Sequence, residues 1–146
     1  MTHPHRDRGA ATLFVVGLSV MLFVLAGLVV DGGLAINARA NAADIAEQAA
    51  RAGAKEIDEA HLRATGQVRI DGVAAQRAAN DFLQDSGFMA KPNAARQITV
   101  SAGGDEIQVA VRRDYQTYLT SLIFINKFTV AAEATARPAV GIEDEL

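Results

Sequence analysis

The fold is decided first by residues 9–30, which read Gly9-Ala-Ala-Thr-Leu-Phe-Val-Val-Gly-Leu-Ser-Val-Met-Leu-Phe-Val-Leu-Ala-Gly-Leu-Val-Val30. This run of 22 residues contains no charged side chain. As an α-helix rising about 1.5 Å per residue it would extend roughly 33 Å, enough to cross a hydrocarbon core of about 30 Å. Thr12 and Ser19 can bond to carbonyls of the preceding turn. The run predicts a transmembrane helix over residues 10–30.

Two other interpretations of this run are weaker. A buried core helix would need a larger domain around it than 146 residues can provide. A cleaved secretory signal peptide has an apolar stretch of about 7–15 residues, followed closely by a small-x-small site. Here Asp31-Gly32-Gly33 follows the run, and the small-x-small triplet Ala38-Arg39-Ala40 lies far from it.

The flanks of the run predict its orientation. Asp31 follows it, and basic side chains precede it: His3, His5, Arg6 and Arg8. Positive charge stays on the cytoplasmic side, so we expect a single-pass protein of the cell membrane with its N-terminus inside. The expected organisation is a cytoplasmic leader (1–9), the transmembrane helix (10–30), an extracytoplasmic αβ domain (31–137) and an acidic tail (138–146).

Charge and composition narrow the classes of function. The net charge is −3 and no cluster of Lys and Arg with interleaved aromatics occurs, which argues against nucleic-acid binding. Cysteine is absent, so disulfides, thiolate metal sites and cysteine nucleophiles are excluded.

The apolar run continues into an Ala-rich segment, Leu34 to about Ala60, predicted to extend the helix with a natural kink point at Gly32-Gly33. A stripe at helical spacing marks its packing face: Ala38, Ala42, Ile45, Ala49 and Ala52. Residues 62–70 are expected to form a loop. Asp71 is placed to cap a second helix over Val73–Ser86, with Phe82 and Leu83 facing inward and Gly87 ending it.

The remaining segment alternates in the manner of strands. Residues 97–102 and 106–111 flank Gly103-Gly104-Asp105 and predict a hairpin. Residues 115–125 are expected to form a short helix and 127–137 a third strand, ended by Pro138. The fold class is therefore α+β: a long N-terminal helix packed on a small antiparallel sheet with short helices.

Catalytic chemistry is not indicated. Gly103-Gly104-Asp105-Glu106 matches the start of the GGDEF signature of diguanylate cyclases, but Ile107 replaces the Phe and a plain turn explains the letters. His3, His5 and His61 lack ligand spacing, so no metal or cofactor is expected. Asp31 is interpreted as the end of the span at the headgroups. The acidic residues of the Ala-rich segment are assigned to the wet face of the long helix: Asp44, Glu47, Glu56, Asp58 and Glu59.

Residues 6–60 carry a family resemblance. Arg6-Asp7-Arg8-Gly9 leads into the apolar run, Val30-Asp31-Gly32-Gly33 closes it, and Ala42-Ala43-Asp44-Ile45-Ala46-Glu47-Gln48-Ala49-Ala50-Arg51-Ala52-Gly53-Ala54 follows. This order resembles the TadE/TadG-like proteins of the bacterial tight-adherence (Flp, type IVb) pilus system, particularly their actinobacterial forms.

The resemblance implies that the α+β fold is pilin-like and that the protein is a minor pseudopilin or assembly factor. It also implies a prepilin-peptidase site at Gly9-Ala10, although Phe14 stands where pilins carry a Glu. The expected partners are membrane lipid and other pilin-like or Tad assembly proteins, with neither nucleic acid nor a small-molecule substrate. The leading hypothesis is a non-enzymatic component of a Flp/Tad pilus or secretion apparatus. The alternatives are a membrane-anchored extracytoplasmic binding or sensory domain unrelated to pili, and an exported hydrolase, which the absence of a catalytic constellation opposes.

Overall fold

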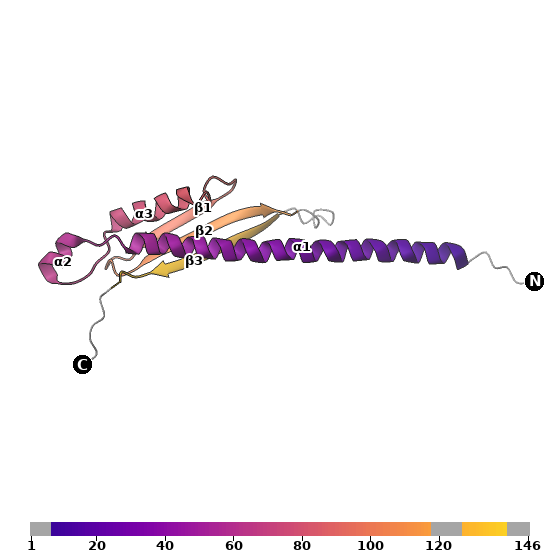
Figure 1. Ribbon diagram of the computed structural model, residues 1–146, viewed down its shortest axis with the longest axis horizontal. Coiled ribbons are helices and arrows are strands. Elements are labelled where there is room, and N and C mark those ends of the chain that lie inside the picture. The colour runs from indigo at the N-terminus through magenta and orange to yellow at the C-terminus, as the bar shows by residue number, and fades with distance from the viewer. Residues whose placement is uncertain (1–6, 118–126, 140–146) are drawn as a thin grey trace, which may run out of the picture. The chain divides into compact units, whose positions relative to one another are not determined.

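The computed structural model describes residues 7–117 and 127–139. Its elements are α1 (Asp7–Ala54), α2 (Glu59–Thr65), α3 (Gly72–Asp85), β1 (Ala95–Val100), β2 (Ile107–Gln116) and β3 (Lys127–Ala136), shown in chain order in Figure 1. The three strands form an antiparallel sheet in the order β1-β2-β3. The predicted α+β class, a long N-terminal helix with short helices on a small antiparallel sheet, is confirmed.

The chain divides into two compact units. Unit 1 comprises Met1–Ile36 with Gln116–Phe128, and unit 2 comprises Asn37–Tyr115 with Thr129–Leu146. Helix α1 contributes its apolar N-terminal part to unit 1 and its Ala-rich part to unit 2. Each unit is therefore described by itself.

Helix α1 is one uninterrupted helix of 48 residues. Gly32 and Gly33 lie within it, so the predicted kink point does not break the helix. The helix ends at Ala54 rather than near Ala60. The earlier end has a tertiary cause: Ile57 forms an isolated antiparallel bridge with Ile70, which requires extended backbone directly after the helix.

Helix α2 includes residues 62–65, so the predicted loop over 62–70 is wrong for those residues. The Asp58 side chain accepts a hydrogen bond from the backbone N–H of His61 and so caps the helix N-terminus. Gly66 ends the helix in the left-handed conformation, with φ of 72°. These local signals support a short helix between two turns.

Helix α3 follows its predicted form closely. The Asp71 carboxylate accepts hydrogen bonds from the N–H groups of Val73 and Ala74, as expected for an N-cap. Gly87 has a positive φ of 69° directly after the helix. Leu83 is fully buried, but Phe82 is only partly buried. Phe88, which the sequence did not single out, is buried in its place.

The hairpin is confirmed with the expected turn. Strands β1 and β2 pair antiparallel from Ala95↔Arg112 to Val100↔Ile107. Gly104 has φ of 69° and its backbone carbonyl accepts from the N–H of Ile70 at 2.6 Å. The GGDE letters therefore form a structural turn that also ties down the connection between α2 and α3.

The predicted third strand is also confirmed, as β3. The predicted short helix over 115–125 is wrong at its start, because Tyr115 and Gln116 belong to β2. Residues 118–126 of that prediction, and residues 140–146 of the acidic tail, lie outside the described residues.

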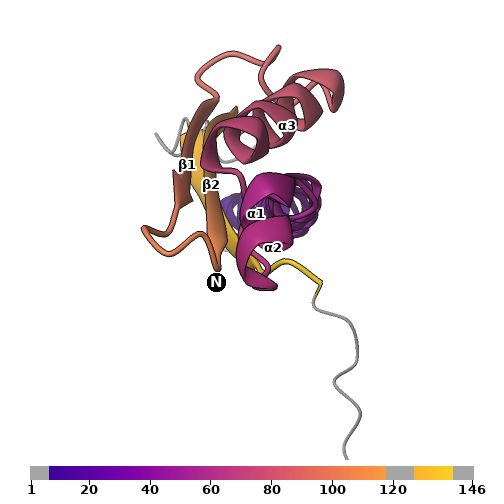
Figure 2. The same ribbon diagram turned by 90° about the vertical axis from the view of Figure 1, so that its left-hand side faces the viewer.

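The core of unit 2 lies between one face of the sheet and two helices. Figure 2 shows α3 and α1 on the same side of the strands. On that face Ile107, Val109 and Val111 of β2 are buried. Within unit 2, the buried positions of α1 are Gly53 and a set of alanines that differs partly from the predicted stripe: Ala38, Ala42, Ala46, Ala49, Ala50 and Ala54. Ile45 and Ala52, which were predicted to face inward, are only partly buried.

Small side chains permit the close packing at the end of α1. A Cβ atom added to Gly53 would lie 2.9 Å from the carbonyl oxygen of Ala75 and would also overlap Ile107. Alanine and glycine thus let α1 approach both α3 and β2. Each of these small residues, however, buries little apolar area.

Candidate membrane segment and interaction surface

The first candidate site is the apolar part of α1 in unit 1. Nearly every large apolar side chain in it is exposed, for example Phe14 at 71%, Phe23 at 78% and Val29 at 75%. Among the described residues, α1 is the helix that is long and apolar enough to cross a membrane. The hydroxyl of Ser19 donates to the carbonyl of Val15 at 2.8 Å, as expected for a polar group in an apolar helix.

Asp31 differs from its expected state. It is only 5% exposed, and no other polar or charged side chain is buried in the described part of the chain. One helical turn earlier, Gly27 is also buried. Asp31 has an interaction partner within the protein. A carboxylate that simply ended the span at the headgroups would be exposed, so the structure gives Asp31 a packing role that the sequence did not indicate.

The candidate processing site, Gly9-Ala10, lies in the first turns of α1. Both residues are exposed, and a Cβ at Gly9 would meet nothing within 4 Å. Phe14, one turn further on, is exposed as well.

The acidic residues assigned to one helix face are distributed over several elements. Asp44 and Glu47 lie exposed on α1, and Glu47 pairs with Arg51 as its i,i+4 partner. The other three are not on α1: Glu56 and Asp58 lie in the connection and Glu59 begins α2. That part of the prediction is wrong, because α1 ends earlier than expected.

Two carboxylates have lowered pKa values with local causes. The hydrogen bond from the His61 N–H, together with the Arg69 guanidinium, lowers the pKa of Asp58 from its ordinary value of 3.8. A hydrogen bond from the Ser101 hydroxyl lowers the pKa of Asp105 in the hairpin turn. Both groups are therefore ionised at neutral pH, which suits a cap and a turn and does not suit a general acid.

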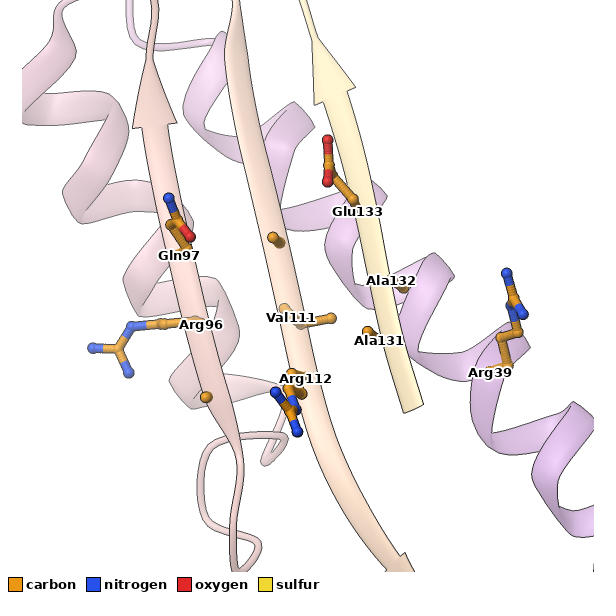
Figure 3. A pocket seen from close by; sticks show the side chains of 10 residues that line it. Arg39, Arg96, Gln97, Val111, Arg112, Ala131, Ala132 and Glu133 are labelled. Carbon is orange, nitrogen blue, oxygen red and sulfur yellow. The ribbon is translucent and has the colours of Figure 1, made fainter. Parts of the chain in front are cut away.

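A second candidate site is a shallow hollow in unit 2, of about 590 Å³. It lies on the sheet face turned away from the helices, here called the outer face (Figure 3). Since Ile107, Val109 and Val111 point to the helices, alternate residues of β2 point outward. The hollow exists because alanines from all three strands form its floor: Ala95, Ala110 and Ala131.

The rim of the hollow is mostly cationic. Arg112 rises from β2, Arg96 extends past the edge of β1, and Arg39 approaches from α1 beside β3 (Figure 3). On the other side, Glu133 accepts a hydrogen bond from Gln108. The described part of the chain shows no ion pair to any of the three arginines. The arrangement suits recognition of an anionic group, and it holds no nucleophile beside a base.

Metal binding has no evident site in the described residues, where no group of three or more His, Cys, Asp or Glu is placed to hold an ion. His61 lies in α2, partly buried. His3 lies outside the described residues, as does His5.

The exposed apolar part of α1 fits a single-pass membrane anchor, and its Ala-rich part belongs to an α+β unit. Residues 9–56 match the family whose description reads "Putative Flp pilus-assembly TadE/G-like". The predicted resemblance to TadE/TadG-like proteins is thereby confirmed over this segment, which is under half of the chain. No curated protein and no solved structure matches the chain. The actinobacterial type stays a prediction.

Proposed function

We propose that the protein is a non-enzymatic, pilin-like component, a minor pseudopilin or an assembly factor, of a Flp/Tad-type pilus or secretion apparatus. The observation that carries the proposal is the TadE/G-like match over residues 9–56, which coincides with α1. The exposed apolar surface of α1 supports a membrane or filament environment for its first half. The absence of a nucleophile–base pair around the hollow is consistent with a structural role.

The direct test is deletion of the gene in its host, scored by counting Flp-type fibres on cells by electron microscopy. We expect fibres to be lost or strongly reduced and to return with the wild-type gene. Normal fibres in the deletion strain would instead favour a membrane-anchored binding or sensory domain unrelated to pili. A neighbouring secretion ATPase gene and a gene for a polytopic Tad membrane protein are also expected.

The proposed topology has a cytoplasmic leader at 1–9, a membrane helix over 10–30 and residues 31–137 outside. Because the chain contains no cysteine, single-cysteine variants report topology without background. Ser86 is exposed, so a membrane-impermeant maleimide applied to intact cells should label the Ser86→Cys variant. Thr2→Cys, read in a strain without prepilin peptidase so that the leader is kept, should be labelled only after lysis. The reverse pattern would overturn the proposed orientation.

Processing between Gly9 and Ala10 is a separate proposal. Intact-mass analysis of the membrane-extracted protein should show a chain beginning at Ala10. A chain that keeps its leader would indicate a permanent anchor, consistent with Phe14 in the place where pilins carry Glu. A chain beginning near Asn41 would indicate signal-peptide cleavage and would contradict the membrane anchor.

A further inference from the structure

The hollow on the outer face concentrates positive charge on a chain whose net charge is −3. Ala95 is opposite Arg112, so Arg112 shares the outer face with Ala95. Arg96 is instead opposite Val111 and extends past the edge of β1 (Figure 3). Arginine presents a planar fork of donors that matches a carboxylate in two contacts. Arg112 above the alanine floor, with Arg39 and Arg96 at its two edges, therefore forms a receptor for carboxylates. None of these arginines has an ion pair in the described part of the chain.

A second, smaller hollow adjoins the first across β1. It has a volume of about 320 Å³ and lies between α3 and β1. Arg96 lines both hollows, and Arg77 of α3 is added in the smaller one. Arg77 also has no ion pair in the described part of the chain. The cationic surface thus continues around the edge of β1, long enough for several carboxylates in succession.

The complementary charge is present in the same sequence. Glu143-Asp144-Glu145 is the longest run of consecutive acidic residues in the chain, and no Lys or Arg lies between Pro138 and Leu146. We propose that the basic hollow, defined by Arg39, Arg96 and Arg112, binds the acidic segment 143–145 of a second copy of this chain.

Geometry favours a second copy over the same chain. Arg137 lies beside Glu106 at the start of β2, with 3.3 Å between Nη2 and Oε2. Arg112, in the hollow, is six residues further along β2, about 20 Å from that point. The six residues from 137 to 143 span about 21 Å when fully extended. The acidic segment of the same chain would therefore have to run back along the sheet in an extended form to reach the hollow, a constraint that a second copy does not have.

The contact would be heterologous, since one copy provides the acidic segment and the other provides the hollow. Contacts of this type can continue from copy to copy and build an open assembly rather than a closed dimer. Such self-association suits a pilus component but does not depend on the proposed function, because it is measured on the purified protein alone.

Disulfide trapping tests the contact on the full-length protein in detergent. One batch carries Gln97→Cys, at the hollow, and the other carries Ile142→Cys, beside the acidic run. Mild oxidation of the mixed batches should give a disulfide-linked species of twice the chain mass. As a control for position, a batch carrying Ser86→Cys replaces the Gln97→Cys batch. This mixture should give little of the disulfide-linked species.

Charge reversal tests the cause. The double variant Arg96→Glu with Arg112→Glu should lower the initial trapping rate about fivefold or more, since exposed ion pairs contribute modestly and two are lost. Reversal of Arg51, exposed on α1 away from the hollow, is the matched control and should leave the rate unchanged. Combining the double variant with Glu143→Arg and Glu145→Arg in the other batch should restore it. The gentler Arg112→Gln should give a smaller decrease without challenging the fold.

Several results would overturn the proposal. One is an equal effect of Arg51→Glu, which would show non-specific charge attraction. Another is a chain carrying both cysteines that closes on itself at monomer mass while mixed batches give no dimer, because the segment would then bind within one chain. A trapping rate that ignores the reversals would exclude the hollow. None of these results bears on the fibre phenotype of the deletion strain, so the two proposals fail separately.

Discussion

At the residue scale, Gly53 shows packing overruling local propensity. Alanine favours a helix over glycine by about 1 kcal/mol. Even so, we expect Gly53→Ala to destabilise the protein by about 1–3 kcal/mol, because the added methyl group would overlap Ile107 and crowd the Ala75 carbonyl. Denaturant unfolding measures the change.

Gly72→Ala is the matched control for that variant. A Cβ at Gly72 would lie 3.8 Å from Cγ1 of Val100, an ordinary van der Waals separation. We expect Gly72→Ala to be neutral or slightly stabilising. Equal stability of Gly53→Ala and Gly72→Ala would show that α1 can move away from the sheet without cost.

Asp58 links pH to stability at the same scale. Its pKa is lower in the folded protein than its ordinary value of 3.8, because the His61 N–H and Arg69 favour the ionised form. The contribution of this carboxylate is therefore present above about pH 4. It is lost as pH falls through the folded-state pKa. Asp58→Asn retains a capping oxygen but removes the charge.

We accordingly expect Asp58→Asn to lower the unfolding midpoint at pH 7 and to approach the wild-type value near pH 3. Thermal unfolding followed across this pH range checks the prediction. A difference between the two proteins that stays constant from pH 7 to pH 3 would mean that the charge of Asp58 does not contribute.

At the scale of elements, the alanine face of α1 determines how closely the helix approaches the sheet. Ala46 is fully buried, whereas Ala43 on the same helix is exposed. Ala46→Leu should cost about 1–3 kcal/mol, because the interface has no room for three more carbon atoms. Ala43→Leu should be nearly neutral. Comparable unfolding free energies for the two variants would contradict the packing described here.

The apolar part of α1 must stay free of charge if it crosses a membrane. Val20 lies near the middle of the run and is 57% exposed. An arginine at the centre of a membrane helix costs about 2.5–3.5 kcal/mol on insertion scales. Val20→Arg should therefore reduce the fraction of protein that stays with membranes after alkaline carbonate extraction, while Ala43→Arg should not. Retention of both variants would argue against a membrane span.

At the scale of the whole molecule, the buried apolar side chains among residues 7–117 and 127–139 belong to unit 2, from Ala38 to Val130. A chain beginning at Asn37 should therefore fold without the apolar run. We expect it to be soluble without detergent and to unfold cooperatively, by circular dichroism, near the midpoint of the full-length protein. A non-cooperative transition would show that unit 1 contributes to the core.

The elements predictable from sequence are those with local causes. The length of the run 9–30 and its lack of charge are enough to predict a helix that can span a membrane. Asp71, as an N-cap residue, predicts the start of α3. The hairpin follows from alternation on either side of Gly103-Gly104-Asp105. The family resemblance likewise rests on a contiguous segment.

Tertiary structure alone decided the rest, because it depends on residues far apart in the chain. Helix α1 stops at Ala54 since the segment after it pairs with Arg69 and Ile70, for example through the Asp58 N–H to the Arg69 carbonyl at 2.8 Å. The second half of α1 contains many alanines, and packing against the sheet determines which of them are buried. No pattern in the residues next to Asp31 in the sequence predicts that its side chain is buried. The basic hollow exists only because three strands bring their alanines together beneath arginines from separate elements.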